Sequence, residues 1–238
     1  MLSKALVKKG YRVLLIDADE SNLGLHRLLG VEAPQVILDS LGGKKGLRER
    51  KKDPLTGERK ELFKENLAWE DLGKTCVMES AGVSLAAMGK IHEAGEGCAC
   101  PIGHLSRDIF SKLQVGNKDM VIIDTAAGIE HFGRDFSSHA DVIVGILDPS
   151  YESLLLSEKI SAMAGKQGYD VGFALNRIDP ETEGFLRERT TGLEVVATIA
   201  RNDMIFHAGL EGKPVTVTDP GIDMLCEWIE GKKGGLRK

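Results

Sequence analysis

The sequence contains no apolar run long enough to cross a lipid bilayer, so it offers no candidate membrane-spanning segment. Cysteine is scarce, with four in 238 residues, and no secretory signal is recognisable. Both features predict a reducing, cytoplasmic environment. Basic residues do not dominate either, because 31 Lys and Arg stand against 36 Asp and Glu, for a net charge of −5. That balance argues against a nucleic acid as the partner.

Two sequence patterns are also missing. The chain shows no internal repeat, and the phosphate-binding pattern G-x-x-x-x-G-K-[ST] occurs nowhere in it. The glycine-rich stretch from Gly42 to Gly46 has neither that spacing nor a clear strand before it, so we expect a loop. It opens the charged stretch 42–64, which predicts a solvated surface or, alternatively, a docking site for a partner.

The residues that are present are typical of one α/β domain spanning residues 1–238. Hydrophobic residues make up 42% and charged residues 28%, enough for a sizeable core under an ordinary polar surface. Periodicity and turn residues predict helices at 1–9 (stopped by Gly10), 22–29, 103–115, 151–163, 182–190 and 204–210, and along the face of Ile222, Leu225, Cys226 and Ile229. Strands are expected at 11–16, 75–79 (with Cys76 in the core), 83–88, 120–123, 141–147, 172–175 and 193–199.

The rest of the chain is organised around the stretch DMVIIDTAAGIEHFGR, residues 119–134. Four apolar residues run into Asp124, as in a buried parallel strand that stops at a ligand site. Sites in open parallel sheets lie beyond the carboxyl ends of the strands, where a carboxylate can hold Mg²⁺ against a phosphate. Ala126, Ala127 and Gly128 then leave room for that phosphate. The alternative is a buried strand followed by an Asp that caps a helix.

Two more acids, Asp17 and Asp19, follow the strand predicted at 11–16. They alternate along the chain, so their side chains are expected on different sides of the strand. The structural alternative to a functional role is that Asp19 or Ser21 only caps the helix predicted at 22–29.

Cys98 and Cys100 form a C-x-C in a predicted loop. In an extended backbone, residues i and i+2 point to the same side, so two thiolates can chelate one soft or borderline metal ion. Two ligands do not complete a tetrahedral site, but a homodimer with its two-fold axis at this loop supplies four. The alternatives are two unpaired reduced cysteines, or further ligands from His92 or His104 of the same chain.

Asn176 ends the strand predicted at 172–175 and is followed by Arg177. An amide side chain both donates and accepts hydrogen bonds, so Asn176 can pair with the amino group and a ring nitrogen of adenine. The alternative is an asparagine turn at a strand end.

Three of these segments resemble the MinD/ParA group of P-loop ATPases. They are VLLIDADESNLG (13–24) for switch I, MVIIDTAAGIEHFGR (120–134) for the Walker B strand and switch II, and ALNRID (174–179) for the adenine-contacting segment. Within that group, GIEHFGR together with GEGCACPIG (95–103) resembles the CooC proteins, the nickel-insertion ATPases of carbon monoxide dehydrogenase and of related acetyl-CoA synthase maturation. The resemblance extends from Leu2 to about Trp228. It implies a P-loop NTPase fold with a mostly parallel sheet flanked by helices.

The resemblance also implies roles for the acidic residues. Asp19 corresponds to the switch acid that orients or activates the attacking water. Asp17 lies near the Mg²⁺ that Asp124 holds, and Asn22 closes on the nucleotide. Gly128 contributes to binding the nucleotide, and the segment of Glu130 and Arg134 couples nucleotide state to the dimer partner.

The other roles implied by the resemblance concern the base, the metal and the partners. Asn176 and Arg177 contact adenine, and Cys98 and Cys100 bind Ni²⁺ or Zn²⁺ between two subunits. The cofactors are therefore ATP, Mg²⁺ and Ni²⁺ (or Zn²⁺). The partners are a second copy of the chain and a client, carbon monoxide dehydrogenase or acetyl-CoA synthase. A nucleic acid is not expected, because of the charge balance. A membrane is not expected either, because the apolar face near the C-terminus is short and is expected to pack on the sheet.

One part of the family pattern is absent, because the first strand and its GKGGVGKT-type loop would precede Leu2. From the spacing of such motifs we expect about 15–20 residues to be missing, through a late start site or a truncated gene. The main hypothesis is a nickel metallochaperone ATPase. The alternatives are a MinD/ParA-type positioning ATPase that binds membrane or DNA, and a nucleotide-free remnant that binds a metal or a partner.

Overall fold

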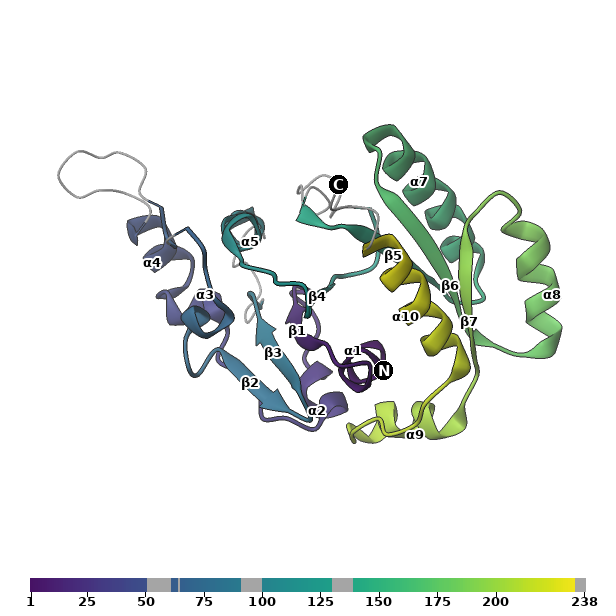
Figure 1. Ribbon diagram of the computed structural model, residues 1–238, viewed down its shortest axis with the longest axis horizontal. Helices are drawn as coiled ribbons and strands as arrows, with labels where there is room; N and C mark the ends of the chain where they lie inside the picture. Colours follow the sequence, from purple (N-terminus) through teal and green to yellow (C-terminus); the bar gives the residue numbers. More distant parts are fainter. Residues whose placement is uncertain (51–60, 64, 91–99, 130–138, 234–238) are drawn as a thin grey trace. The chain divides into compact units, whose positions relative to one another are not determined.

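The computed structural model describes residues 1–50, 61–63, 65–90, 100–129 and 139–233 (Figure 1). The chain forms two compact units. The N-terminal unit comprises Leu6–Ala127 with Gly212–Pro214, and the C-terminal unit comprises Met1–Ala5, Gly128–Glu211 and Val215–Lys238. Each unit combines a sheet of mostly parallel strands with helices, which confirms the predicted α/β class. The single domain over residues 1–238 stays a prediction.

The sheet of the N-terminal unit has the strand order β2-β3-β1-β4. Its strands are β1 (Arg12–Asp17), β2 (Val77–Ser80), β3 (Val83–Ala87) and β4 (Asp119–Asp124). β1 pairs in parallel with both β3 and β4, whereas β2 pairs antiparallel with β3. Since β1, β3 and β4 run in one direction, their carboxyl ends meet at one edge of the sheet, where ligand sites form in such sheets.

β1 is the covered central strand of this sheet. Val13, Leu14 and Ile16 are fully buried, which explains the unbroken apolar run in the sequence. β4 pairs only with β1 among the described strands, and most of its side chains are half-buried. The prediction of a buried strand before Asp124 therefore holds only for Met120.

Local sequence signals place several helices correctly. Gly10, at a φ of +89°, follows the end of α1 (Leu2–Lys8). α5 (Cys100–Lys112) fully buries Leu105 and Ile109, and Cys76 is in the core, as predicted. The other helices of this part of the chain are α2 (Leu25–Leu29), α3 (Ile37–Ser40), α4 (Gly43–Arg50) and the 3-10 helix η1 (Trp69–Leu72).

Two predictions in this part of the chain are wrong. The Gly42–Gly46 stretch is not a loop, because α4 begins at Gly43 and buries Leu47. Burying a leucine against the core outweighs the low helix propensity of the glycines. α2 begins at Leu25, later than predicted, because the residues before it form hydrogen-bonded turns.

The sheet of the C-terminal unit is parallel throughout, in the order β5-β6-β7. Its predicted helix at 182–190 begins slightly earlier, because the Asp179 carboxylate accepts a hydrogen bond from the Thr182 N–H and Pro180 occupies the first turn. The strands are β5 (Val142–Leu147), β6 (Asp170–Ile178) and β7 (Val195–Ala200), and the helices are α7 (Tyr151–Gln167), α8 (Pro180–Arg189), α9 (Asp203–Glu211) and α10 (Pro220–Lys233).

The apolar face of α10 packs against β7. Ile222, Leu225, Cys226 and Ile229 are all buried there, which confirms the predicted face. Among the helices that the structure describes, none is long and apolar enough to cross a bilayer.

Candidate functional site

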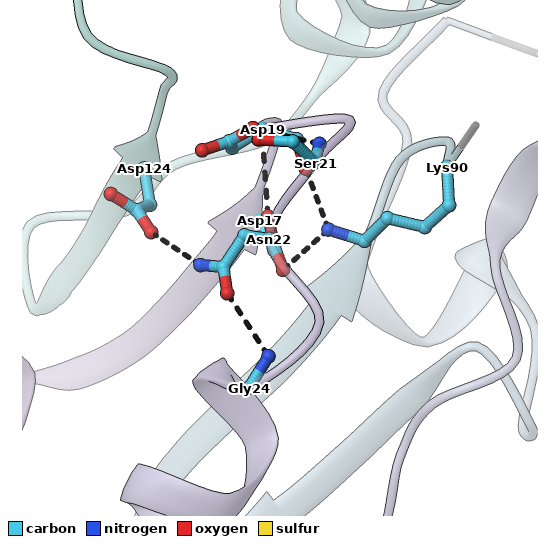
Figure 2. A network of polar contacts seen from close by, with 7 residues as sticks. All are labelled: Asp17, Asp19, Ser21, Asn22, Gly24, Lys90 and Asp124. Atoms are coloured by element: carbon cyan, nitrogen blue, oxygen red, sulfur yellow. Dashed lines mark hydrogen bonds and ion pairs between the residues drawn. The ribbon is translucent and has the colours of Figure 1, made fainter. Parts of the chain in front are cut away.

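The site predicted at the strand ends lies on two neighbouring strands of the N-terminal unit (Figure 2). Asp17 ends β1 and Asp124 ends β4, and the two residues are opposite each other in the parallel register. The backbone continues this pairing, because the Ala18 N–H donates to the Asp124 carbonyl at 2.8 Å. The fold thus brings together two carboxylates that are far apart in the sequence.

The third acid, Asp19, organises a tight turn after β1. Its Oδ1 accepts hydrogen bonds from the Ser21 N–H at 2.8 Å and from the Ser21 hydroxyl at 2.7 Å. Its own N–H donates to Oδ1 of Asp17 at 3.2 Å. The alternative that Asp19 or Ser21 caps α2 is wrong, because Gly24 holds the N-cap position.

Asn22 lies between the two strand ends. Its Nδ2 donates to Oδ2 of Asp124 at 3.4 Å, and its Oδ1 accepts from the Gly24 N–H at 3.1 Å. The first of these contacts is long for a hydrogen bond and therefore weak. Asn22 thus joins the carboxylate of β4 to the start of α2 without tightly engaging that carboxylate.

Sequence reasoning missed Lys90, which enters the site from beyond the end of β3. Its Nζ donates to Oδ2 of Asp17 at 2.7 Å and to the Asp19 carbonyl at 2.6 Å (Figure 2). Lys90 and Asp17 are both buried, so this ion pair is largely screened from water. The only sequence signal is a lone lysine shortly after an apolar strand.

The electrostatics of the three carboxylates differ. Burial raises the pKa of Asp17, although the Lys90 ammonium opposes that shift. Burial also raises the pKa of Asp124, and the charges of Asp17 and Asp19 raise it further. For Asp19 burial acts in the same direction, but hydrogen bonds from Ser21 outweigh it and lower the pKa overall. Asp124 is therefore the carboxylate whose charge is least compensated by its surroundings.

This arrangement fits a magnesium ion. No three potential ligand side chains of the described residues are placed to hold a metal ion by themselves. Mg²⁺ commonly uses only one or two carboxylates and completes its shell with water and substrate phosphates. Asp124 has the charge and the position at the strand end for that role.

We expect Asp124→Asn to stabilise the cation-free chain at neutral pH by roughly 0.5–2 kcal/mol, the usual range for a single stabilising substitution. Because folding raises the pKa of Asp124, its contribution to stability is fully present below the unfolded pKa and is lost as the pH rises through the folded pKa. The advantage of the variant should therefore grow with pH. Thermal unfolding between pH 4 and 8 measures it, with Asp141→Asn, at an exposed aspartate, as the control. A variant less stable than the parent at pH 7 would contradict this account.

The predicted base-contacting residues lie in the C-terminal unit, where they share one acid. Asn176 donates through Nδ2 to Oδ1 of Asp148 at 2.8 Å, and Arg177 donates through Nη1 to Oδ2 of the same carboxylate at 3.2 Å. Both lie within β6, not beyond its end, and Arg177 has a φ of +58°. Sequence reasoning missed Asp148, which fixes the orientation of the Asn176 amide.

Of the remaining predicted site residues, the structure describes some and not others. Gly128 has a φ of +120°, a conformation that favours glycine. Cys98 and His92 lie outside the described residues. Cys100 is the first residue of α5, so the prediction of a loop is wrong at that position. His104 is exposed on α5.

Comparison with known proteins places the chain in a family, although no family model matches it. It is 43% identical over 213 residues to an uncharacterized ATP-binding protein of Methanocaldococcus jannaschii, covering 90% of this chain and 86% of that protein. It is 34% identical over 196 residues to the carbon monoxide dehydrogenase accessory protein CooC of Rhodospirillum rubrum, covering 75% and 73%.

Solved structures agree on the fold. A chain of the MinC:MinD cell division protein complex of Aquifex aeolicus matches with a TM-score of 0.63 at 19% identity, covering 97% of this chain and 87% of that one. A ParA family ATPase from Chlorobium tepidum matches with a TM-score of 0.61 at 16% identity, covering 95% and 88%. The identity to CooC therefore shows that the chain belongs to the CooC family, and the solved structures show that it has the fold of MinD and ParA proteins.

Proposed function

We propose that this protein is an ATP-dependent accessory factor that delivers nickel to carbon monoxide dehydrogenase or to acetyl-CoA synthase. The observation that carries the proposal is the pair of aligned carboxylates, Asp17 and Asp124, in a chain similar to CooC over 75% of its length. Such strand-end acids suit a protein that handles magnesium and phosphate.

In this proposal the acidic residues have different roles in binding and hydrolysing the nucleotide. Asp124 would hold Mg²⁺, which when bound neutralises charge on the phosphates. Asp19 stays ionised, since its pKa is lowered, and is suited to accept a hydrogen bond from a water molecule. Asn22 lies beside Asp124 and would contact the nucleotide. No stretch of these 238 residues has the phosphate-cradle pattern, so the proposal assigns that function to none of them.

Adenine recognition is assigned to Asn176 and Arg177. Asp148 accepts one N–H of the Asn176 amide, which leaves the second N–H and the amide oxygen to pair with a ring nitrogen and the amino group of adenine. Arg177 is held by the same carboxylate and is mostly exposed, which suits a residue that lies beside a ligand.

The nickel ion is the cargo in this proposal. Cys98 and Cys100 of two subunits would bind it through four thiolates, with Zn²⁺ as the alternative ion. Nucleotide turnover in the dimer would then accompany release of the metal to the client enzyme.

Calorimetric titration with Mg²⁺ and ATP tests the nucleotide part. We expect binding by a chain extended with the family's N-terminal strand and phosphate loop, and at least about 100-fold weaker binding by the 238-residue chain, because each lost charge-assisted hydrogen bond costs about 1.5–3 kcal/mol. Nickel-dependent activation of client apoenzymes by the extended chain tests delivery. Binding to lipid vesicles or DNA, with no activation of either client, would instead support a positioning ATPase.

A further inference from the structure

Lys90 is the member of the acidic site that the proposed function leaves without a role. We propose that Lys90 is a positioning residue, which holds the Asp17 carboxylate away from direct coordination of a divalent cation and so leaves that cation to Asp124. This inference deepens the proposed function and rests on its assignment of Mg²⁺ to this site.

The first support is that both oxygens of the Asp17 carboxylate are already engaged. Oδ2 accepts from the Lys90 ammonium at 2.7 Å, and Oδ1 accepts from the Asp19 N–H at 3.2 Å. The side chains of Lys90 and Asp17 are only 8% and 7% exposed, so water does not compete strongly for the pair. Direct coordination of a metal by Asp17 would require the ammonium to give up a short, buried contact.

The backbone that leads from β3 to Lys90 is also constrained. Ala87 at the end of β3 is in register with Asp17, and the Met88 N–H donates to the Asp17 carbonyl at 2.9 Å. At Gly89 a Cβ atom would lie only 2.8 Å from Cδ1 of Ile102. Lys90 therefore follows a constrained segment of backbone. Its second hydrogen bond, from Nζ to the Asp19 carbonyl at 2.6 Å, also stabilises the turn that contains Asp19, the candidate catalytic residue.

The charges point to the same division of roles. Asp17, Asp19 and Asp124 carry three negative charges when ionised, and Lys90 carries one positive charge. The net charge of the four side chains is then −2, which one divalent cation would neutralise. Among the described residues, the Asp124 carboxylate has only the long 3.4 Å hydrogen bond from Asn22, so it is the carboxylate best able to accept that ion.

Manganese binding to the nucleotide-free 238-residue chain, followed by electron paramagnetic resonance of free Mn²⁺, tests the inference. Lys90→Met removes the ammonium and releases Asp17, so Mn²⁺ should bind at least about tenfold more tightly than to the parent, because both changes make the site more attractive to a cation. Lys90→Arg keeps the charge and should stay within about twofold of the parent. Lys166→Met, at an exposed lysine of α7, is the matched control.

A lysine with a purely structural role would give no tighter binding, so equal or weaker binding by Lys90→Met overturns the inference. Two variants that retain Lys90 provide a test even where Lys90→Met does not fold. Asp124→Asn should abolish Mn²⁺ binding, whereas Asp17→Asn should weaken it only modestly. Equal losses would make Asp17 a direct ligand and also overturn the inference. The Mn²⁺ measurements do not depend on ATP or nickel binding. A failure of the proposed function can therefore be distinguished from a failure of this inference.

Discussion

A chain carrying both Cys98→Ser and Cys100→Ser is expected to lose nickel and zinc binding by more than about 100-fold, because even changes around metal ligands cost about 10–100-fold. Serine lacks the soft thiolate that selects such ions, and replacing both positions removes all four ligands of the proposed dimeric site. The metal-linked dimer should disappear with the metal. Metal analysis combined with light scattering after gel filtration measures both effects.

The two other cysteines provide the control for this experiment. Cys76 and Cys226 are buried and not part of the C-x-C, so the double variant Cys76→Ala and Cys226→Ala keeps the proposed ligands. It should bind metal and dimerise like the parent, at a modest cost in stability. Unchanged metal uptake by the serine variant would refute the C-x-C site and leave the family fold unaffected.

Gly221→Ala is expected to destabilise the chain by about 3 kcal/mol or more, above the usual range for overpacking because the obstacle is backbone. A Cβ atom at Gly221 would lie 2.1 Å from the Thr198 carbonyl oxygen and 2.7 Å from its carbon. The first turn of α10 therefore approaches β7 so closely that no side chain fits. For a chain of this length, 3 kcal/mol corresponds to a fall in Tm of about 6–12 °C.

The same helix supplies a matched control. Gly231 also lies in α10, but no atom is within 4 Å of the position its Cβ would take. Gly231→Ala should therefore stabilise the helix by about 0.5–1 kcal/mol, because alanine loses less backbone entropy on folding. Thermal unfolding of both variants checks the pair, and a loss of stability in Gly231→Ala comparable to that in Gly221→Ala would refute the close-approach explanation.

Much of the fold follows from short-range patterns. The apolar run Val13–Ile16 predicts a covered strand, and every residue of β1 after Arg12 is buried. The spacing of Leu225 and Cys226 with their apolar neighbours predicts the buried face of α10. These elements were predictable because the hydrophobic pattern that indicates each of them lies within a single strand or a single helix.

The errors have a shared cause. α4 forms where glycines predicted a loop, because Leu47 finds a core that the local sequence does not show. β4 is less buried than its apolar run implies, because burial depends on the strands beside it and not on its own composition.

The sequence by itself determined the α/β class, the family and the candidate residues Asp17, Asp19 and Asp124, since each follows from residues close together in the chain. Only the tertiary structure decided that Lys90 neutralises Asp17 and that Asp148 orients Asn176. Both contacts join residues that are distant in the sequence and leave no periodic trace in it. They form because parallel strands bring their carboxyl ends to one edge of a sheet, where charges from separate segments must compensate one another.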